Sequence, residues 1–289
     1  MTNLTLVNPQ NGNLAFKIAS FDNSNFDHIQ RLNYYAVLLL QNGNAELKSD
    51  FSTWPVAAGS LIFFSPYQPF MFSAKEKFKG TAIYFHPDFF CIHKHHKEVA
   101  CHGVLFNNIY DPPFIKVTDK ETEKFQQIIE QMKTEMQDAS LAQYELLVSH
   151  LKIFLIHASR LKGLQNEAAA TESSQSKEPF ILQNLKGYIE DNFKTKRSPA
   201  DYAAMLNISP KTLAKATKNY FNKTLTDLIA ERVIIEAKRE LYLTSKPVKE
   251  IAWQLGFEDE YYFSRFFKKN ADVSPQMYRE TVGFARADA

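Results

Sequence analysis

The chain has 289 residues, of which 45% are hydrophobic, and a formal net charge of +2. This length predicts two domains, and the composition excludes an intrinsically disordered chain. The longest purely apolar run, residues 34–40, is far shorter than the roughly 18–20 residues of a membrane helix, so no membrane partner is expected. The first residues do not resemble a secretory signal. Together these observations predict a cytoplasmic protein.

The N-terminal part, residues 1–116, contains short β-type runs without helices between them. These runs are residues 14–21, 32–40, 60–64, 70–73 and 81–85. Turn residues separate them, and Asn42-Gly43 is typical of a hairpin between two strands. Several short strands in this order predict a β-sandwich or a β-barrel.

Residue types that bind metals cluster after the last of these runs. They are Cys91, His93, His95, His96, Cys101 and His102. Their spacing differs from the C-x₂-C and H-x₃-H patterns of zinc sites, and Lys94 and Lys97 place positive charge among them. Two cysteines are also too few for a disulfide scaffold. We favour a solvated loop with one buried cysteine, and metal or redox sensing is the alternative.

Helical patterns begin after Pro113. Residues 119–137 form the first, and residues 141–161 form the second. In the second, apolar residues alternate at spacings of three and four, which is typical of a coiled-coil seam: Tyr144, Leu147, Leu151, Phe154, Ala158 and Leu161. Such a seam either packs on the β-domain or joins two copies of the chain. Residues 163–179 then lack periodicity and predict a flexible linker.

Residues 180–289 contain a duplicated helical pattern. The first copy has apolar residues at Pro199, Tyr202, Ala203 and Leu206, and the second, 49 positions later, at Val248, Ile251, Ala252 and Leu255. Each stripe leads into a turn, at Asn207 and Gly256, and then a second helix with a polar, basic outer face. This layout predicts two helix-turn-helix units joined by a helix over residues 225–243.

Charge is distributed unevenly between the two parts of the chain. Residues 1–178 hold 16 Lys and Arg against 18 Asp and Glu, a net charge of −2, whereas the remainder holds 18 against 14, a net charge of +4. The basic excess therefore lies with the helix-turn-helix pattern, as attraction to phosphate requires.

The second unit carries a pattern that points to a family. Residues 248–279 contain IA, GF, YFSRFFKK, SP and YR in this order, and this pattern resembles the DNA-binding domain of AraC-type transcriptional regulators. The resemblance implies a two-domain α+β chain. A cupin-like β-barrel over residues 1–116 would precede a helical dimerisation segment over 117–162. The linker 163–179 and an all-α double helix-turn-helix domain over 180–289 would follow.

The resemblance also implies which residues contact DNA. The base-facing positions that it implies are Lys211, Ala214 and Lys215 on the first recognition helix and Glu260, Tyr261, Ser264 and Arg265 on the second. The helical pattern adds Thr212, Lys218 and Lys268 on the exposed faces. Lys218 and Lys268 suit phosphate, whereas Lys215 and Arg265 can donate to guanine. For any single lysine the alternative is a solvated helix face. For Arg265 it is a bond within the fold.

The residues therefore predict a sequence-specific transcriptional regulator rather than an enzyme. Metal-dependent cupin enzymes need histidines on facing strands, and residues 34–40 and 59–64 contain none. No cofactor or metal is expected. The expected partners are double-stranded promoter DNA, a second copy in a homodimer, a small-molecule effector in the barrel at unassigned residues, and the RNA polymerase that an activator contacts. The residues themselves do not distinguish activation from repression. The alternatives are control by a protein partner or a metal, and a cupin enzyme fused to a DNA-binding domain.

Overall fold

The computed structural model describes residues 3–9, 12–95, 103–138, 140–172 and 180–282. The chain divides into two compact units. The first contains Met1–Asn108 and Pro112–Gln165, and the second contains Ile109–Asp111 and Asn166–Ala289.

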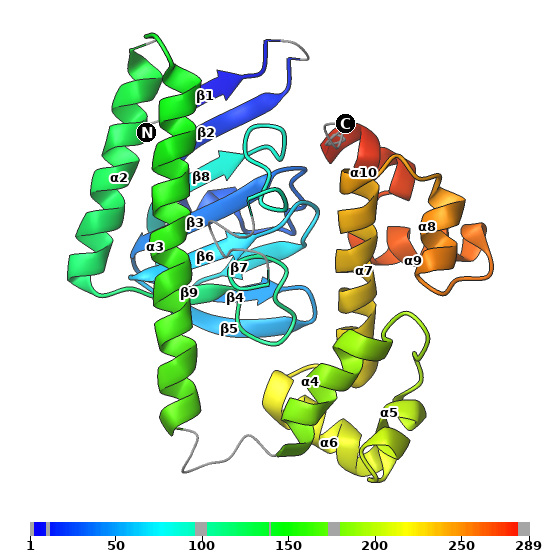
Figure 1. Ribbon diagram of the computed structural model, residues 1–289. Coiled ribbons are helices and arrows are strands. Elements are labelled where there is room, and N and C mark those ends of the chain that lie inside the picture. The colour runs from blue at the N-terminus through cyan, green and yellow to red at the C-terminus, as the bar shows by residue number, and fades with distance from the viewer. Residues whose placement is uncertain (1–2, 10–11, 96–102, 139, 173–179, 283–289) are drawn as a thin grey trace. The chain divides into compact units, whose positions relative to one another are not determined.

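The first unit is built on two antiparallel sheets (Figure 1). The six-stranded sheet has the order β1 (Asn3–Val7), β2 (Leu14–Asp22), β8 (Lys79–Phe85), β3 (Tyr35–Asn42), β6 (Ser60–Phe64) and β9 (Phe114–Lys116). The three-stranded sheet has the order β5 (Ser52–Ala57), β4 (Asn44–Ser49) and β7 (Phe70–Ser73). Each of the five predicted β-type runs contains a strand, and the run 32–40 is a strand from Tyr35 onwards, which confirms the predicted β-domain.

The central strands of the large sheet are buried on both faces. In β3, Val37 and Leu39 belong to a core beneath the helices, whereas Ala36 and Leu38 belong to a second core between the two sheets. Adjacent residues of a strand point to opposite faces. A strand covered on both sides is therefore apolar throughout, and this explains the continuous apolar run of the sequence.

The predicted hairpin at Asn42-Gly43 is wrong. Strand β3 pairs with β6 and β8, whereas β4, which begins at Asn44, pairs with β5 and β7 in the other sheet. Gly43 has a φ of 83°, and an added Cβ would lie 2.6 Å from the carbonyl oxygen of Lys77. The glycine thus serves a crossing between sheets at a close backbone approach.

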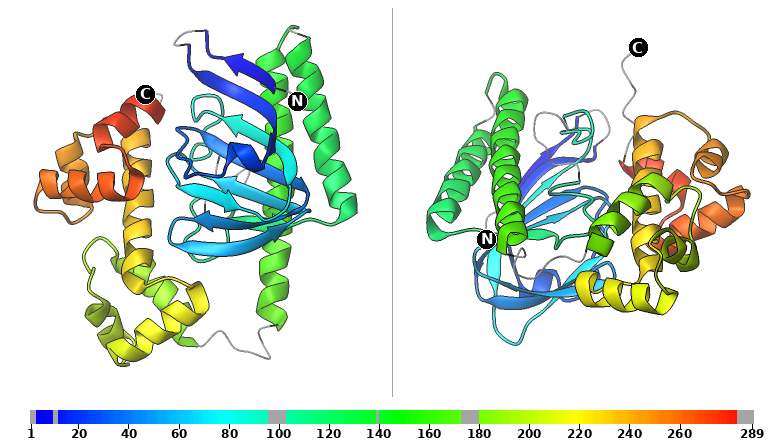
Figure 2. Two further views of the ribbon diagram at one scale, coloured as in Figure 1. Left: turned by 180° about the vertical axis from the view of Figure 1, so that it is seen from behind. Right: turned by 60° about the horizontal axis from the view of Figure 1, so that its bottom comes forward.

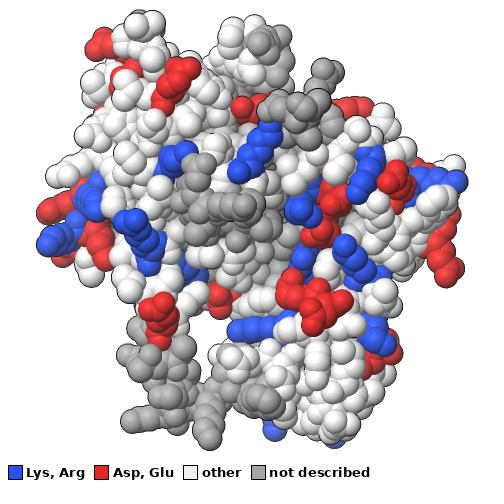
Figure 3. Space-filling view, in the orientation of Figure 1, with Lys and Arg blue, Asp and Glu red and all other residues white. Residues whose placement is uncertain are grey.

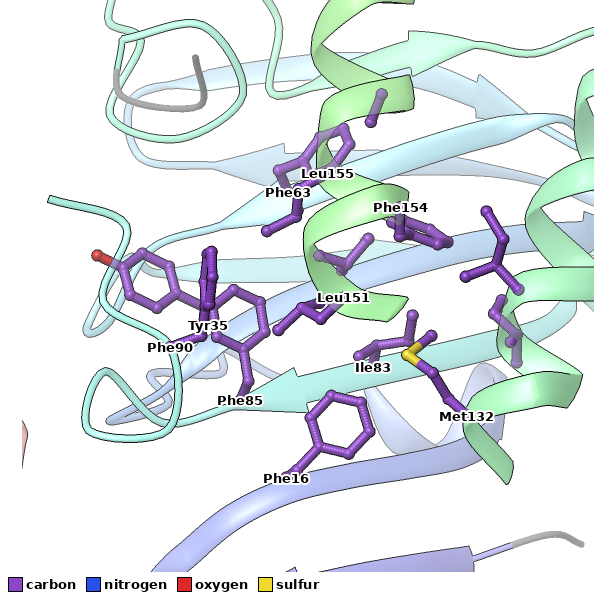
Figure 4. Packing of buried hydrophobic residues seen from close by; sticks show 14 of the residues in the cluster. Phe16, Tyr35, Phe63, Ile83, Phe85, Phe90, Met132, Leu151, Phe154 and Leu155 are labelled. Carbon is purple, nitrogen blue, oxygen red and sulfur yellow. The ribbon is translucent and has the colours of Figure 1, made fainter. Parts of the chain in front are cut away.

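Two long helices, α2 (Asp119–Gln137) and α3 (Gln143–Glu172), lie side by side across the six-stranded sheet (Figures 1 and 2). A capping box starts α2, because the Thr118 side chain accepts from the N–H of Glu121 while the Glu121 carboxylate accepts from the N–H of Thr118. Figure 4 shows Leu151, Phe154 and Leu155 of α3 packed with sheet residues such as Phe63 and Ile83.

The assignment of the α3 seam to dimerisation is therefore a misreading. Leu147, Leu151, Phe154 and Ala158 are fully buried against the sheet, so this face is not available to a second copy. The alternative interpretation, packing on the β-domain, is the one that the structure supports. Heptad-like spacing reports a buried stripe on a helix and does not identify what buries it.

The predicted linker is also shorter than expected. Helix α3 continues to Glu172, so residues 163–172 are helical, and residues 173–179 lie outside the described part. Leu, Gln, Glu and Ala dominate this stretch, and all are strong helix formers. Helix propensity, which needs no apolar periodicity, accounts for this extension of α3.

The second unit is helical. It contains α4 (Phe180–Asn192), α5 (Pro199–Met205), α6 (Pro210–Phe221), α7 (Leu225–Leu243), α8 (Val248–Gln254), α9 (Glu260–Ala271) and α10 (Pro275–Val282). Helix α7 runs between the α5–α6 pair and the α8–α9 pair (Figures 1 and 2). None of the described helices is both long and apolar enough to cross a bilayer.

Candidate nucleic-acid interface

Helix α6 presents the first polar face. It begins at Pro210, where the Ser209 hydroxyl accepts a hydrogen bond from the N–H of Thr212 at 3.1 Å. Leu213, Thr217 and Phe221 are buried, which leaves the opposite face to solvent. Every residue predicted to contact DNA from this helix is exposed: Lys211, Thr212, Ala214, Lys215 and Lys218.

Helix α9 presents the second polar face. The Asp259 carboxylate accepts from the N–H of Tyr262 at 2.5 Å and caps the helix start. Phe263, Phe267 and Ala271 are buried. Three of the predicted contact residues are exposed: Tyr261, Arg265 and Lys268. The other two, Glu260 and Ser264, are half-buried. Arg265 is exposed, and among the described residues its guanidinium has no hydrogen bond or ion pair within the fold.

The two helix pairs repeat each other in three dimensions. Helices α5 and α8 have 7 residues each, and α6 and α9 have 12 residues each. The intervening turns place Asn207 at a φ of 53° and Gly256 at a φ of 77°, and the second helices end at the left-handed residues Asn222 and Asp272. Asn, Asp and Gly are the residues that adopt this backbone most readily. The duplication inferred from the sequence is therefore confirmed.

The cores of the two pairs differ in size at one equivalent position. Thr217 of α6 is fully buried, and its hydroxyl donates to the carbonyl of Ala214 at 3.1 Å. The matching Phe267 of α9 is also fully buried, and its ring contacts the rings of Phe263 and Tyr278. The threonine hydroxyl is satisfied by its own helix, but it fills less space than the phenylalanine ring.

Positive charge gathers on the two recognition helices. Helix α6 contains no acidic residue, and α9 contains one, Glu260. The exposed cations of the two helices are Lys211, Lys215, Lys218, Arg265, Lys268 and Lys269. In the view of Figure 3, basic and acidic side chains are interspersed over the face that is seen. A concentration of cations on two helix faces favours the DNA backbone as a partner.

Sequence reasoning missed an exposed aromatic group beside α9. Trp253 of α8 is 55% exposed, and the Nζ atom of Lys249 lies 4.8 Å from the centre of its ring. Tyr262 at the start of α9 is also 55% exposed. The signal was present in the sequence, because Trp253 falls outside the apolar stripe of its helix. An exposed indole N–H next to a cation is a suitable phosphate contact.

The Cys and His cluster of the first unit is only partly described. Cys91 is 9% exposed, and its Sγ accepts from the N–H of Lys94 at 3.4 Å, while the His95 ring stacks on Phe90 at 4.9 Å. His96, Cys101 and His102 lie outside the described residues. Among the residues that are described, no group of three His, Cys, Asp or Glu is placed to hold a metal ion.

Aromatic side chains fill the core between the two sheets. Phe64 stacks on Phe70 with ring centres 3.8 Å apart and planes within 4°. Phe21, Phe26, Phe72 and Phe78 join this cluster, and each of the six rings is at most 4% exposed. The aromatic side chains of this region therefore form a packed core.

Two family models match the chain. One is described as an AraC-like ligand binding domain and matches residues 11–152. The other is described as a helix-turn-helix domain and matches residues 202–281, which run from within α5 through α6, α7, α8 and α9 into α10.

Curated relatives match part of the chain. The HTH-type transcriptional activator Btr of Bacillus subtilis (strain 168) is 30% identical over 149 residues, which cover 44% of this chain and 28% of Btr. The activator RhaS of Enterobacter sp. (strain 638) is 26% identical over 172 residues, 58% of each chain. An uncharacterized HTH-type transcriptional regulator in the cgkA 5' region of Pseudoalteromonas carrageenovora is 31% identical over 126 residues, 42% of this chain and 75% of that protein. The chain thus spans less than two thirds of Btr and of RhaS. All three relatives are named as transcriptional regulators.

Proposed function

The chain belongs to the AraC family of transcriptional regulators, and we propose that it recognises a specific promoter sequence through α6 and α9. One observation carries this proposal. Two helices of equal length, on either side of α7, each present an exposed cationic face while their apolar faces are buried. Recognition helices arranged as a pair enter successive major grooves, about 34 Å apart along the duplex.

The exposed residues divide by the chemistry they offer to DNA. Arg265 and Lys215 can donate to O6 and N7 of guanine, and Glu260 can accept from N4 of cytosine. Lys218 and Lys268 lie toward the ends of their helices, where they suit phosphate oxygens. Base contacts provide the specificity and phosphate contacts provide the salt-dependent part of the affinity.

Replacing Arg265 by alanine is expected to weaken binding by about 1–3 kcal/mol and to relax the preference at one base pair. The reason is the loss of a bidentate donor at a base edge. The measurement is fluorescence anisotropy with a duplex selected from random-sequence DNA by the wild-type protein, and with single-base variants of that duplex. Lys269→Ala is the matched control, because Lys269 is exposed on the same helix and suits phosphate. If Arg265→Ala weakens binding equally on all duplexes, Arg265 contacts the backbone instead.

For the homodimer we propose the outer face of α3 in place of its buried seam. Leu146, Ile153 and Leu164 are 42%, 45% and 62% exposed. Leu146, His150, Ile153 and His157 follow one another at spacings of four, three and four residues, and Leu164 lies on the same face seven residues further on. Such a stripe suits a helix of a second copy. Burial, followed by the charges of Lys124 and Arg160, lowers the pKa of His157. The imidazole therefore stays neutral at neutral pH, which is compatible with an apolar contact.

Replacing Ile153 by glutamate is expected to give a folded monomer, because a charge would then stand in the centre of the apolar stripe. Light scattering measures the mass, and circular dichroism checks the fold. Glu145→Lys, which changes the charge on another face of the same helix, should leave the mass unchanged. A dimer that persists in Ile153→Glu would place the interface elsewhere, and a monomeric wild type would remove the dimer proposal.

Control by a small molecule is proposed for the first unit, because residues 11–152 match a ligand binding domain. Screening the full chain by thermal shift against metabolites separates this control from control by a protein partner, which would leave the melting temperature unmoved. The names of Btr and RhaS favour activation, and hence RNA polymerase as a further partner in the cytoplasm.

A further inference from the structure

The loop between α4 and α5, residues 193–198, leads into the first helix pair, α5 and α6. It nevertheless contacts the second pair, α8 and α9. The guanidinium carbon of Arg197 lies 3.7 Å from the centre of the Phe257 ring. The Nη2 atom of Arg197 donates a hydrogen bond to the carbonyl of Leu255, the residue that follows the end of α8. Arg197 therefore both stacks on an aromatic ring and caps a helix C-terminus in the other pair.

Phe257 connects this contact to the recognition helix. Its ring centre lies 5.0 Å from that of Phe263 and 5.2 Å from that of Phe266, and both belong to α9. Phe257 and Phe263 are 2% and 0% exposed. A displacement of Phe257 would therefore be transmitted through packed rings to α9.

The same loop approaches the turn of the second pair at a second point. Gly256 lies directly beside the carbonyl oxygen of Lys194, so close that a Cβ at this position would overlap the oxygen. Gly256 also has a φ of 77°. The backbone of the loop and the backbone of the turn are thus in direct contact.

The loop is also fixed to the first pair and to α7. The hydroxyl of Tyr202, a fully buried residue of α5, donates to the carbonyl of Lys196 at 3.0 Å. The guanidinium of Arg232, from α7, lies 4.1 Å from the centre of the Phe193 ring. Arg232 is itself held by Glu190 at 2.7 Å and Glu236 at 3.1 Å. The loop is therefore held by contacts with α5, with α7 and with the turn after α8.

We propose that this loop, through Arg197, is a second connection between the two helix-turn-helix units and sets the distance and angle between α6 and α9. This inference rests on the proposed function as a DNA-binding protein. Helix α7 packs against α4 and α6 of the first unit and against α8, α9 and α10 of the second, and the contact at Leu255 and Phe257 adds a direct connection between the two units. A pair of recognition helices that is preorganised loses less entropy when both enter the duplex. Arg197 is a positioning residue and need not touch DNA.

The test compares two duplexes. One is the site selected from random-sequence DNA by the wild-type protein, and the other carries an insertion of about five base pairs, half a helical turn, between its two groove contacts. Wild type should strongly prefer the selected duplex. Arg197→Ala should bind that duplex roughly tenfold more weakly, the scale of one desolvated cation–π contact. The preference of Arg197→Ala for the selected duplex over the inserted duplex should also fall, because the two helix-turn-helix units can then change their relative position.

Arg279→Ala is the matched control. Arg279 also caps carbonyls, donating to Leu241 at 3.1 Å and to Lys246 at 2.8 Å, but these contacts join α10 to the end of α7 and the loop that follows. Its loss should lower the melting temperature and leave the ratio between the two duplexes unchanged. Arg197→Lys keeps the charge without the planar stack, and it should fall between wild type and Arg197→Ala.

Two outcomes contradict the inference in different ways. A folded Arg197→Ala protein with the wild-type ratio between the duplexes would show that α7 alone sets the geometry. If Arg197→Ala does not fold, the same comparison with Arg197→Lys decides the question. A wild-type protein that selects no duplex would overturn the proposed function itself, and the inference with it.

Discussion

Replacing Phe154 by alanine is expected to destabilise the first unit by about 3–5 kcal/mol, the cost of a large buried aromatic side chain. Phe154 is fully buried in α3, and its ring centre lies 4.7 Å from that of Phe125 in α2 (Figure 4). The truncation would leave a cavity where both helices meet the sheet. Urea unfolding followed by circular dichroism measures the change, and a loss of this size is a large fraction of a domain's total stability.

An exposed residue away from the proposed dimer face is the control for this experiment. Glu145 is exposed on the same helix, so Glu145→Ala should change the stability by at most about 0.5 kcal/mol. If Phe154→Ala were as mild as Glu145→Ala, the face of α3 that carries Phe154 would not pack on the sheet, and the correction of the dimer seam would fail.

Replacing Gly256 by alanine is expected to destabilise the second unit strongly. The left-handed backbone costs a residue with a Cβ about 1–2 kcal/mol, and Gly256 has a φ of 77°. The new methyl group would also overlap the carbonyl oxygen of Lys194, so the α4–α5 loop must move. We expect a loss of more than about 2 kcal/mol in total, together with weaker DNA binding. Thermal unfolding and fluorescence anisotropy measure the two effects.

The same substitution at Gly187 should have the opposite sign. Gly187 lies in the middle of α4, and an added Cβ would meet no atom within 4 Å outside the adjacent backbone of its own helix. Alanine there should stabilise the second unit by about 0.5–1 kcal/mol, because glycine is the less favourable residue inside a helix. Equal effects at the two positions would contradict the close contact between Gly256 and the loop.

Much of the architecture is predictable because it follows from short-range patterns. The apolar stripe of α8 repeats that of α5 at a constant offset, and each stripe ends in a residue that accepts a left-handed backbone, Asn207 or Gly256. Both signals depend on local geometry alone. The exposure of the predicted contact residues on α6 follows in the same way, since Leu213, Thr217 and Phe221 turn that face outward.

The features that could not be predicted depend on partners distant in the sequence. The apolar stripe of α3 correctly predicts a buried helix face. It does not indicate whether a sheet or a second copy of the chain covers that face. Gly43 signals a turn without indicating that the next strand joins the other sheet. Arg197 is an ordinary loop residue by pattern, and its role depends on Phe257, which lies 60 positions further along the chain.

The burial of β3 on both faces affects the solubility of the protein. Tyr35–Leu40 contains no charge, no proline and no glycine, and such a run readily forms cross-β aggregates when it is released. In the folded unit β3 is paired on both edges, by β6 and β8, and covered on both faces. By covering one face of β3, the helices α2 and α3 therefore protect the protein against aggregation. Their loss would lower its solubility before it altered any binding surface.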